Sequence, residues 1–198
     1  MLVKLSGIFA VLIAVTGTHA SADSLDSLPA SWQQLRSVIQ VETSTLKVDE
    51  QKAISEARKR IEALLQSQQP DIKQLASEYG NLGNLYLTHE LYTSADACYS
   101  NAMQLSPDAF PWAYYSAYLA QENGNMDEAL SRYINASELD PNYLPARYRL
   151  AQVYSDLNRT DEAYAMFNAL LNEPGFEAAA YNGIGQVFLL KHDYSNAV

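Results

Sequence analysis

The sequence predicts an all-α protein in which a pair of helices is repeated along the chain. Three observations support this prediction. Small and aromatic residues recur at a constant spacing of 34 residues, turn-forming residues and prolines separate the stretches between them, and a stretch before the repeats follows the helical period. A hydrophobic content of 48% over 198 residues is enough for a folded core, and the length suits one domain with a small extension.

The first 22 residues have the pattern of a secretory signal peptide. Lys4 precedes an apolar run over 7–15, and Ala20 and Ala22 flank Ser21 in the small-x-small pattern that signal peptidase reads. We expect cleavage after Ala22, with a cut after Ala20 as the alternative, and an exported protein, periplasmic or secreted, without a stable membrane anchor after cleavage. An uncleaved anchor is the other interpretation, but the apolar run is short against the roughly 20 residues that a spanning helix needs.

Two segments lie between the signal peptide and the repeats. Residues 23–48 show no clear period and are expected to form an irregular arm, with a short helix over 31–40 as the alternative. Residues 49–69 are predicted to form an amphipathic helix that Asp49 caps and Pro70 ends. Its apolar positions are Ala53, Ile54, Ala57, Ile61, Leu64 and Leu65. This helix is expected to cover the exposed face of the first repeat, as terminal units of solenoids do.

Four columns of residues are repeated at the 34-residue spacing. They are Gly83, Ala117, Ala151 and Gly185; Ala95, Ala129, Ala163 and Ala197; Tyr86, Ala120, Tyr154 and Phe188; and Tyr99, Tyr133 and Phe167. We expect the two small-residue columns to be close contacts between helices, with the aromatic residues filling the space beside them. Pro107 and Pro141 end the second helix of a copy, because proline lacks the N–H that would continue it. In the first copy the two helices are predicted over 71–88 and 93–105.

The first copy carries the pattern most completely, with Tyr79, Leu82, Gly83, Tyr86, Ala95, Tyr99, Ala102 and Pro107. It resembles the tetratricopeptide repeat family. The resemblance covers residues 76–198 and implies a right-handed superhelical solenoid of helix-turn-helix repeats over 76–109, 110–143, 144–177 and, in part, 178–198. The second copy departs from the family pattern, because small residues stand where bulkier ones are usual: Ala113, Ser116, Ala117 and Ala120.

The resemblance also implies a concave groove lined by the first helix of each repeat, and this groove is the candidate partner-binding site. Its expected residues are Asn84, Tyr114, Tyr118, Gln121, Tyr148, Arg149, Gln152, Asn182 and Gln186. Tyrosine and amide side chains suit the backbone of an extended peptide or a partner helix. The alternative is that several of these tyrosines only pack repeats together.

One subgroup of the family grips a C-terminal carboxylate with lysine, arginine and asparagine. The matching positions here are Gly80, Asn84, Tyr115, Pro145 and Arg149. Both lysines are absent, so we reject this mode of binding because its charge-assisted hydrogen bonds are mostly lost.

Composition argues against several other functions. A formal net charge of −10 disfavours nucleic acid as the partner, since phosphate binding requires a basic face. One cysteine and three separated histidines supply no metal-site spacing, and no catalytic constellation or cofactor motif is present. We therefore expect no enzymatic activity, no cofactor and no metal. Cys98 is expected to be a small residue on a helix, with an intermolecular disulfide as the alternative.

The sequence thus predicts an exported scaffold or adaptor that binds a partner peptide or protein of unknown identity through the concave face. The alternative is the repeat portion of a longer exported enzyme or envelope-assembly protein, and a small-ligand carrier is a weaker possibility. We also expect the natural chain to continue beyond Val198, because the fourth repeat has only begun its second helix there.

Overall fold

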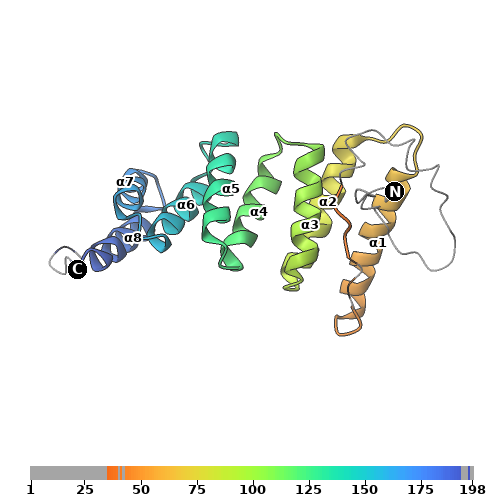
Figure 1. Ribbon diagram of the computed structural model, residues 1–198, viewed down its shortest axis with the longest axis horizontal. Coiled ribbons are helices and arrows are strands. Elements are labelled where there is room, and N and C mark those ends of the chain that lie inside the picture. The colour runs from red at the N-terminus through yellow and green to blue at the C-terminus, as the bar shows by residue number, and fades with distance from the viewer. Residues whose placement is uncertain (1–34, 40, 42, 193–195, 197–198) are drawn as a thin grey trace, which may run out of the picture. The chain divides into compact units, whose positions relative to one another are not determined.

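The computed structural model describes residues 35–39, 41, 43–192 and 196, and within these residues the secondary structure is entirely helical. The helices are α1 (Val48–Leu65), α2 (Ile72–Thr88), α3 (Tyr92–Leu105), α4 (Phe110–Glu122), α5 (Met126–Leu139), α6 (Leu144–Asp156), α7 (Thr160–Leu170) and α8 (Glu177–Leu190) (Figure 1). They fall into two compact units, the N-terminal unit up to Pro107 and the C-terminal unit from Asp108. The prediction of an all-α fold of repeated helices is confirmed.

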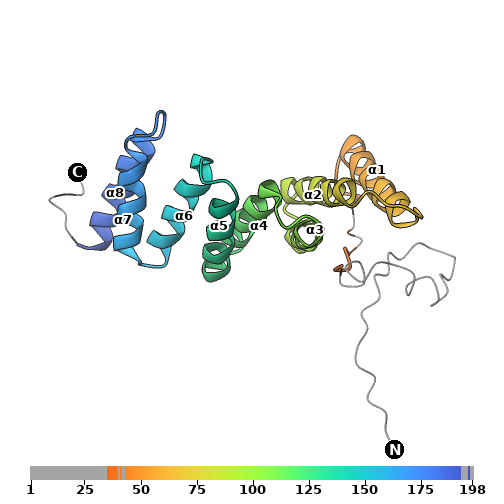
Figure 2. The same cartoon turned by 90° about the horizontal axis from the view of Figure 1, so that it is seen from above.

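In the N-terminal unit, α1 packs on α2, and α2 packs on α3 (Figure 2). Helix α1 begins at Val48, so Asp49 is not its cap. The backbone N–H of Lys47 instead donates to the Glu50 carboxylate at 2.9 Å, which satisfies one of the groups left over at a helix start. The helix ends at Leu65, before the predicted stop at Pro70.

Helices α2 and α3 approach closely at Gly83. A methyl group built on this glycine would lie 2.7 Å from Cε1 of the buried Tyr99 ring. The Tyr99 hydroxyl donates to Oδ1 of Asn84 at 2.7 Å and ties the two helices together. Cys98, which precedes Tyr99 on α3, is fully buried, and this burial raises the pKa of its thiol.

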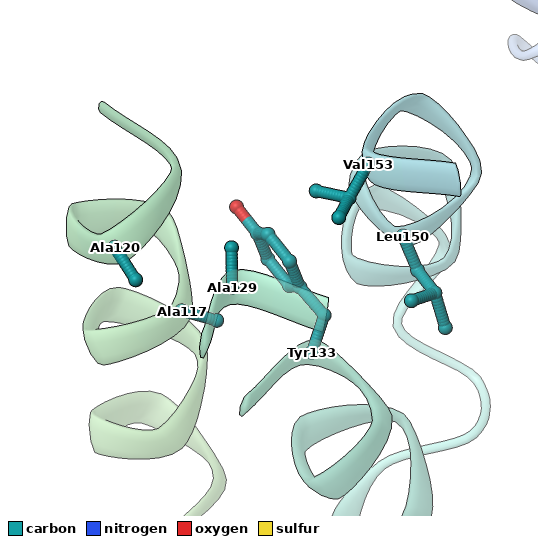
Figure 3. Close-up of a cluster of buried hydrophobic side chains, with 6 residues drawn as sticks. All are labelled: Ala117, Ala120, Ala129, Tyr133, Leu150 and Val153. Atoms are coloured by element: carbon teal, nitrogen blue, oxygen red, sulfur yellow. The ribbon is translucent and has the colours of Figure 1, made fainter. Parts of the chain in front are cut away.

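The C-terminal unit has two apolar clusters. The first joins α4, α5 and α6 and consists of Ala117, Ala120, Ala129, Tyr133, Leu150 and Val153 (Figure 3). The second surrounds Phe167 and joins α6, α7 and α8. Ala129 and Ala163 are both fully buried, as expected for helix–helix contacts.

In the last described helix the close contact is made by Gly183. A methyl group at Gly183 would lie 2.5 Å from Cε1 of Phe167, whereas Gly185, the expected contact, is only partly buried. The contact expected for Gly185, with the second helix of its own repeat, lies outside the described residues and stays a prediction. The helix–helix approach selects a glycine where an aromatic ring of the preceding helix presses on the backbone.

Two residues after the end of the first helix of each repeat, one residue has left-handed backbone. These residues are Glu90, Gly124, Asn158 and His192, with φ values of 58°, 74°, 58° and 58°, and each lies 34 residues after the one before. In the first copy the N–H of Glu90 donates to the Leu87 carbonyl and the N–H of Leu91 to the Tyr86 carbonyl. This pair of bonds is the Schellman arrangement that closes a helix.

Two expectations concern segments before the helices. Residues 35–39 have no helical structure, so a short helix over 31–40 does not form across them. The predicted signal peptide, residues 1–22, lies outside the described residues. Within the described part of the chain, no helix is both long and apolar enough to cross a membrane.

Candidate partner-binding surface

Six of the nine expected groove residues gather on α4 and α6 of the C-terminal unit. This surface, called the tyrosine face below, comprises Tyr114, Tyr118, Gln121, Tyr148, Arg149 and Gln152. Helix α4 contacts α6 as well as α5, and Tyr133 of α5 lies beside them with its ring centre 6.0 Å from that of Tyr114. All six side chains are partly buried, so they are held in place yet remain accessible.

Arg149 connects the two helices of the tyrosine face. Its guanidinium carbon lies 5.1 Å from the centre of the Tyr118 ring, a cation–π distance. Burial raises the pKa of Tyr114, and the hydrogen bond and charge of Arg149 oppose that rise. The phenol of Tyr114 is therefore a neutral hydrogen-bonding group beside the fixed positive charge of Arg149.

The amide groups of Asn84 and Gln121 have an equivalent structural role in two repeats. Tyr133 donates its hydroxyl hydrogen to Oε1 of Gln121 at 3.0 Å, as Tyr99 does to Asn84 in the N-terminal unit. Because the amide oxygen is occupied in each case, the NH₂ group is the part of the side chain left to meet a partner.

Gln152 presents the opposite arrangement. Its Nε2 donates to the Tyr148 hydroxyl oxygen at 3.3 Å, while its Oε1 is buried without a hydrogen-bond partner among the described residues. A buried acceptor without a donor is destabilising, so the Gln152 side chain would gain by turning this oxygen outward to accept from an N–H group of a bound chain.

The remaining expected residues are not part of the tyrosine face. Asn182 and Gln186 lie exposed on α8 and bond to each other, with 3.0 Å between Gln186 Nε2 and Asn182 Oδ1. Asn84 belongs to the N-terminal unit, whereas the tyrosine face is part of the C-terminal unit.

Sequence reasoning missed two aromatic residues next to the face. Phe110 begins α4 and Tyr143 precedes α6, and their ring centres are 4.8 Å apart. Tyr143 also lies 5.2 Å from Tyr114. The available signal was the density of aromatic residues at the start of a repeat, but they lie at the helix ends, outside the columns that the resemblance assigns to the groove.

Comparisons with known proteins agree with this architecture. Models of the tetratricopeptide repeat match residues 79–109 and 120–186. A comparison with curated protein sequences gave no match.

Several solved structures have the same fold. A crystal structure of MamA protein is 20% identical, with 75% of this chain and 77% of that chain covered and a TM-score of 0.66. YrrB, described as a tetratricopeptide repeat protein with an unusual peptide-binding site, is 22% identical, with 79% and 76% covered and a TM-score of 0.66. A tetratricopeptide repeat protein from Parabacteroides merdae is 17% identical, with 75% and 56% covered and a TM-score of 0.68. Residues 79–109 and 120–186 of this chain are therefore similar to tetratricopeptide repeats, and the chain shares the fold of these structures.

Proposed function

We propose that this protein is an interaction scaffold that binds an extended segment of a partner protein through the tyrosine face. The observation that carries the proposal is the gathering of Tyr114, Tyr118 and Arg149 on one surface of α4 and α6, with Gln152 on the same helix as Arg149. Tyrosine supplies broad contact area and a hydroxyl group at a modest cost in side-chain entropy.

The polar groups of the face suit a peptide backbone. Gln121 has an NH₂ group to donate, and the buried Oε1 of Gln152 needs a donor. An extended chain offers carbonyl and N–H groups in alternation, so both needs can be met by one bound segment. Because five of the six side chains of the face are tyrosines or amides, binding is expected to depend more on ring contacts and hydrogen bonds than on a particular partner charge.

The test is capture of partners from an extract of the source organism by the immobilised chain, with quantification by mass spectrometry. We expect Tyr118→Ala combined with Gln152→Ala to lower capture about tenfold or more, since central interface residues often cost over 1 kcal/mol each on truncation. The matched control is Tyr164→Ala combined with Asn168→Ala, because both residues are exposed on α7 outside the face. Equal capture by the two double variants, with helicity by circular dichroism unchanged, would move the interface away from the tyrosine face.

We further propose that the protein is exported, on the strength of the pattern in residues 1–22. N-terminal sequencing of the protein from its host is expected to begin at Ser21 or Asp23. A retained Met1 would contradict export by cleavage.

A further inference from the structure

Residues 35–39 are held against α1 and α3 in the way a protein holds a bound peptide (Figure 1). The side-chain amide of Asn101 bonds twice to one backbone residue. Its Oδ1 accepts from the N–H of Arg36, and its Nδ2 donates to the Arg36 carbonyl oxygen at 2.9 Å. One amide group can meet both only when the N–H and C=O of that residue point the same way, as in extended backbone.

The far end of the segment is fixed through a second carbonyl. The oxygen of Ile39 accepts from the Arg58 guanidinium at 2.8 Å and from the Ser94 hydroxyl at 3.4 Å. Arg58 is itself positioned by Tyr86, whose hydroxyl oxygen accepts from Arg58 Nε at 2.7 Å and whose ring lies 5.7 Å from the guanidinium carbon. The group that reads the peptide carbonyl is thus oriented by the repeat, independently of the segment.

Two side chains of the segment are also recognised. The Arg36 guanidinium pairs with the Asp96 carboxylate and bonds to the Ser100 hydroxyl at 3.0 Å. Leu35 is only 4% exposed, whereas Ile39 is 59% exposed. The contacts therefore select a leucine followed by an arginine and leave the residue at the position of Ile39 nearly free.

The receiving residues are unusual for their place in the repeat. Asn101 is fully buried and Ser94 is 2% exposed. The residues 34 positions further on, Asn135 and Glu128, are both exposed on α5. If the segment left, Asn101 would lose both hydrogen bonds to the Arg36 backbone and keep the Tyr79 hydroxyl as a partner, and lost hydrogen bonds at a buried amide are costly. Its burial is explained by the need to hold a backbone segment.

We propose that α1 and α3 form a second peptide-binding site, specific for an extended segment with a Leu-Arg pair, and that residues 35–39 occupy it in cis until a partner segment of the same chemistry replaces them. This site is separate from the tyrosine face and does not rest on it. Eight residues join the segment to α1, so its effective concentration is of millimolar order. A partner segment binds well only when the cis segment is released.

The test uses the full chain and a fluorescein-labelled peptide of residues 33–41 as the probe. A released variant, Leu35→Asp with Arg36→Asp, replaces the buried leucine by a charge and repels Asp96, while every helix keeps its sequence. We expect the peptide to bind the released variant at least tenfold more tightly than the parent chain by fluorescence anisotropy, because the cis competitor is gone. Failure of the peptide to bind a released variant of parental helicity would overturn the proposal.

Two further changes in the released variant separate recognition from folding. Asn101→Ala is expected to weaken peptide binding about tenfold or more, since two hydrogen bonds are lost, whereas Asn135→Ala, the matched exposed position, leaves binding unchanged. Asp96→Lys should favour a probe peptide with Glu in place of Arg36 over the parental peptide. If Asn101→Ala does not fold, this reversal of charge preference remains decisive, and its absence would contradict the site.

The outcome also distinguishes the source of the segment. If the parent chain is a dimer that excess peptide converts to a monomer in gel filtration, the segment is exchanged between two copies, and the assignment to a separate partner is overturned. Undiminished partner capture by the tyrosine-face variants, with binding of the probe peptide intact, would leave this second site standing without the tyrosine face.

Discussion

Replacement of Glu90 by glycine is predicted to stabilise the protein. Glu90 has a φ of 58°, a left-handed conformation that costs a residue with a Cβ roughly 1–2 kcal/mol and costs glycine almost nothing. Glycine is more flexible in the unfolded chain, which offsets roughly 0.5–1 kcal/mol of that gain. The side chain of Glu90 makes no hydrogen bond or ion pair among the described residues, so little else is lost. The net gain is about 0.5–1 kcal/mol.

The same column supplies the matched controls. Gly124→Ala is expected to destabilise by about the same 0.5–1 kcal/mol, because no atom lies within 4 Å of the added methyl group and only the backbone conformation opposes it. Asn158→Gly is expected to be nearly neutral, since asparagine tolerates the left-handed region. The assay is thermal unfolding followed by circular dichroism, where the Glu90 change should raise the melting temperature by about 1–4 °C. A lower melting temperature for Glu90→Gly would refute the reasoning.

Three other predictions concern the packed columns. Gly83→Ala should destabilise by about 1–3 kcal/mol in urea unfolding, although alanine is the better helix former, because the methyl group overlaps the Tyr99 ring; a gain in stability would contradict that contact. Ala163→Leu should cost about 1–3 kcal/mol by overpacking a fully buried position, and an unchanged unfolding curve would place Ala163 elsewhere. Burial raises the pKa of Tyr133, so its contribution to stability is full below the unfolded pKa of about 10 and is lost as pH rises above it. Tyr133→Phe should therefore flatten the fall in stability at alkaline pH, and it should cost about 1 kcal/mol at pH 7 because the hydrogen bond to Gln121 is lost. An unchanged slope of stability against pH would argue against this.

The fold could be predicted because repetition turns weak preferences into a strong signal. One alanine on a helix says little, but Ala95, Ala129 and Ala163 at a spacing of 34 residues require the same helix contact in each copy, and all three are buried. The left-handed column was harder to recognise. Gly124 and Asn158 have the chemistry of a turn, whereas Glu90 and His192 do not, because the Schellman bonds impose the conformation on whatever residue follows the helix.

The candidate surface could be predicted in part, for a related reason. The resemblance assigns residues to a helix face, which correctly grouped Tyr114, Tyr118 and Arg149. It carries no information on residues at helix ends, such as Phe110. Nor does it show which amide oxygens already accept a hydrogen bond within the repeat, as Gln121 does from Tyr133. The binding of residues 35–39 could not be foreseen, since it depends on contacts between residues 65 positions apart without any repeated pattern.

The burial of Cys98 makes the protein its own reporter of local opening. The chain has one thiol, that thiol is 0% exposed, and its raised pKa keeps the reactive thiolate scarce while the helices around it are closed. Alkylation in native buffer is therefore expected to proceed through local opening of the helices around Cys98, and its rate measures how often this opening occurs. Because the C-terminal unit contains no cysteine, the alkylation rate reports on opening of the N-terminal unit alone, and no label has to be introduced.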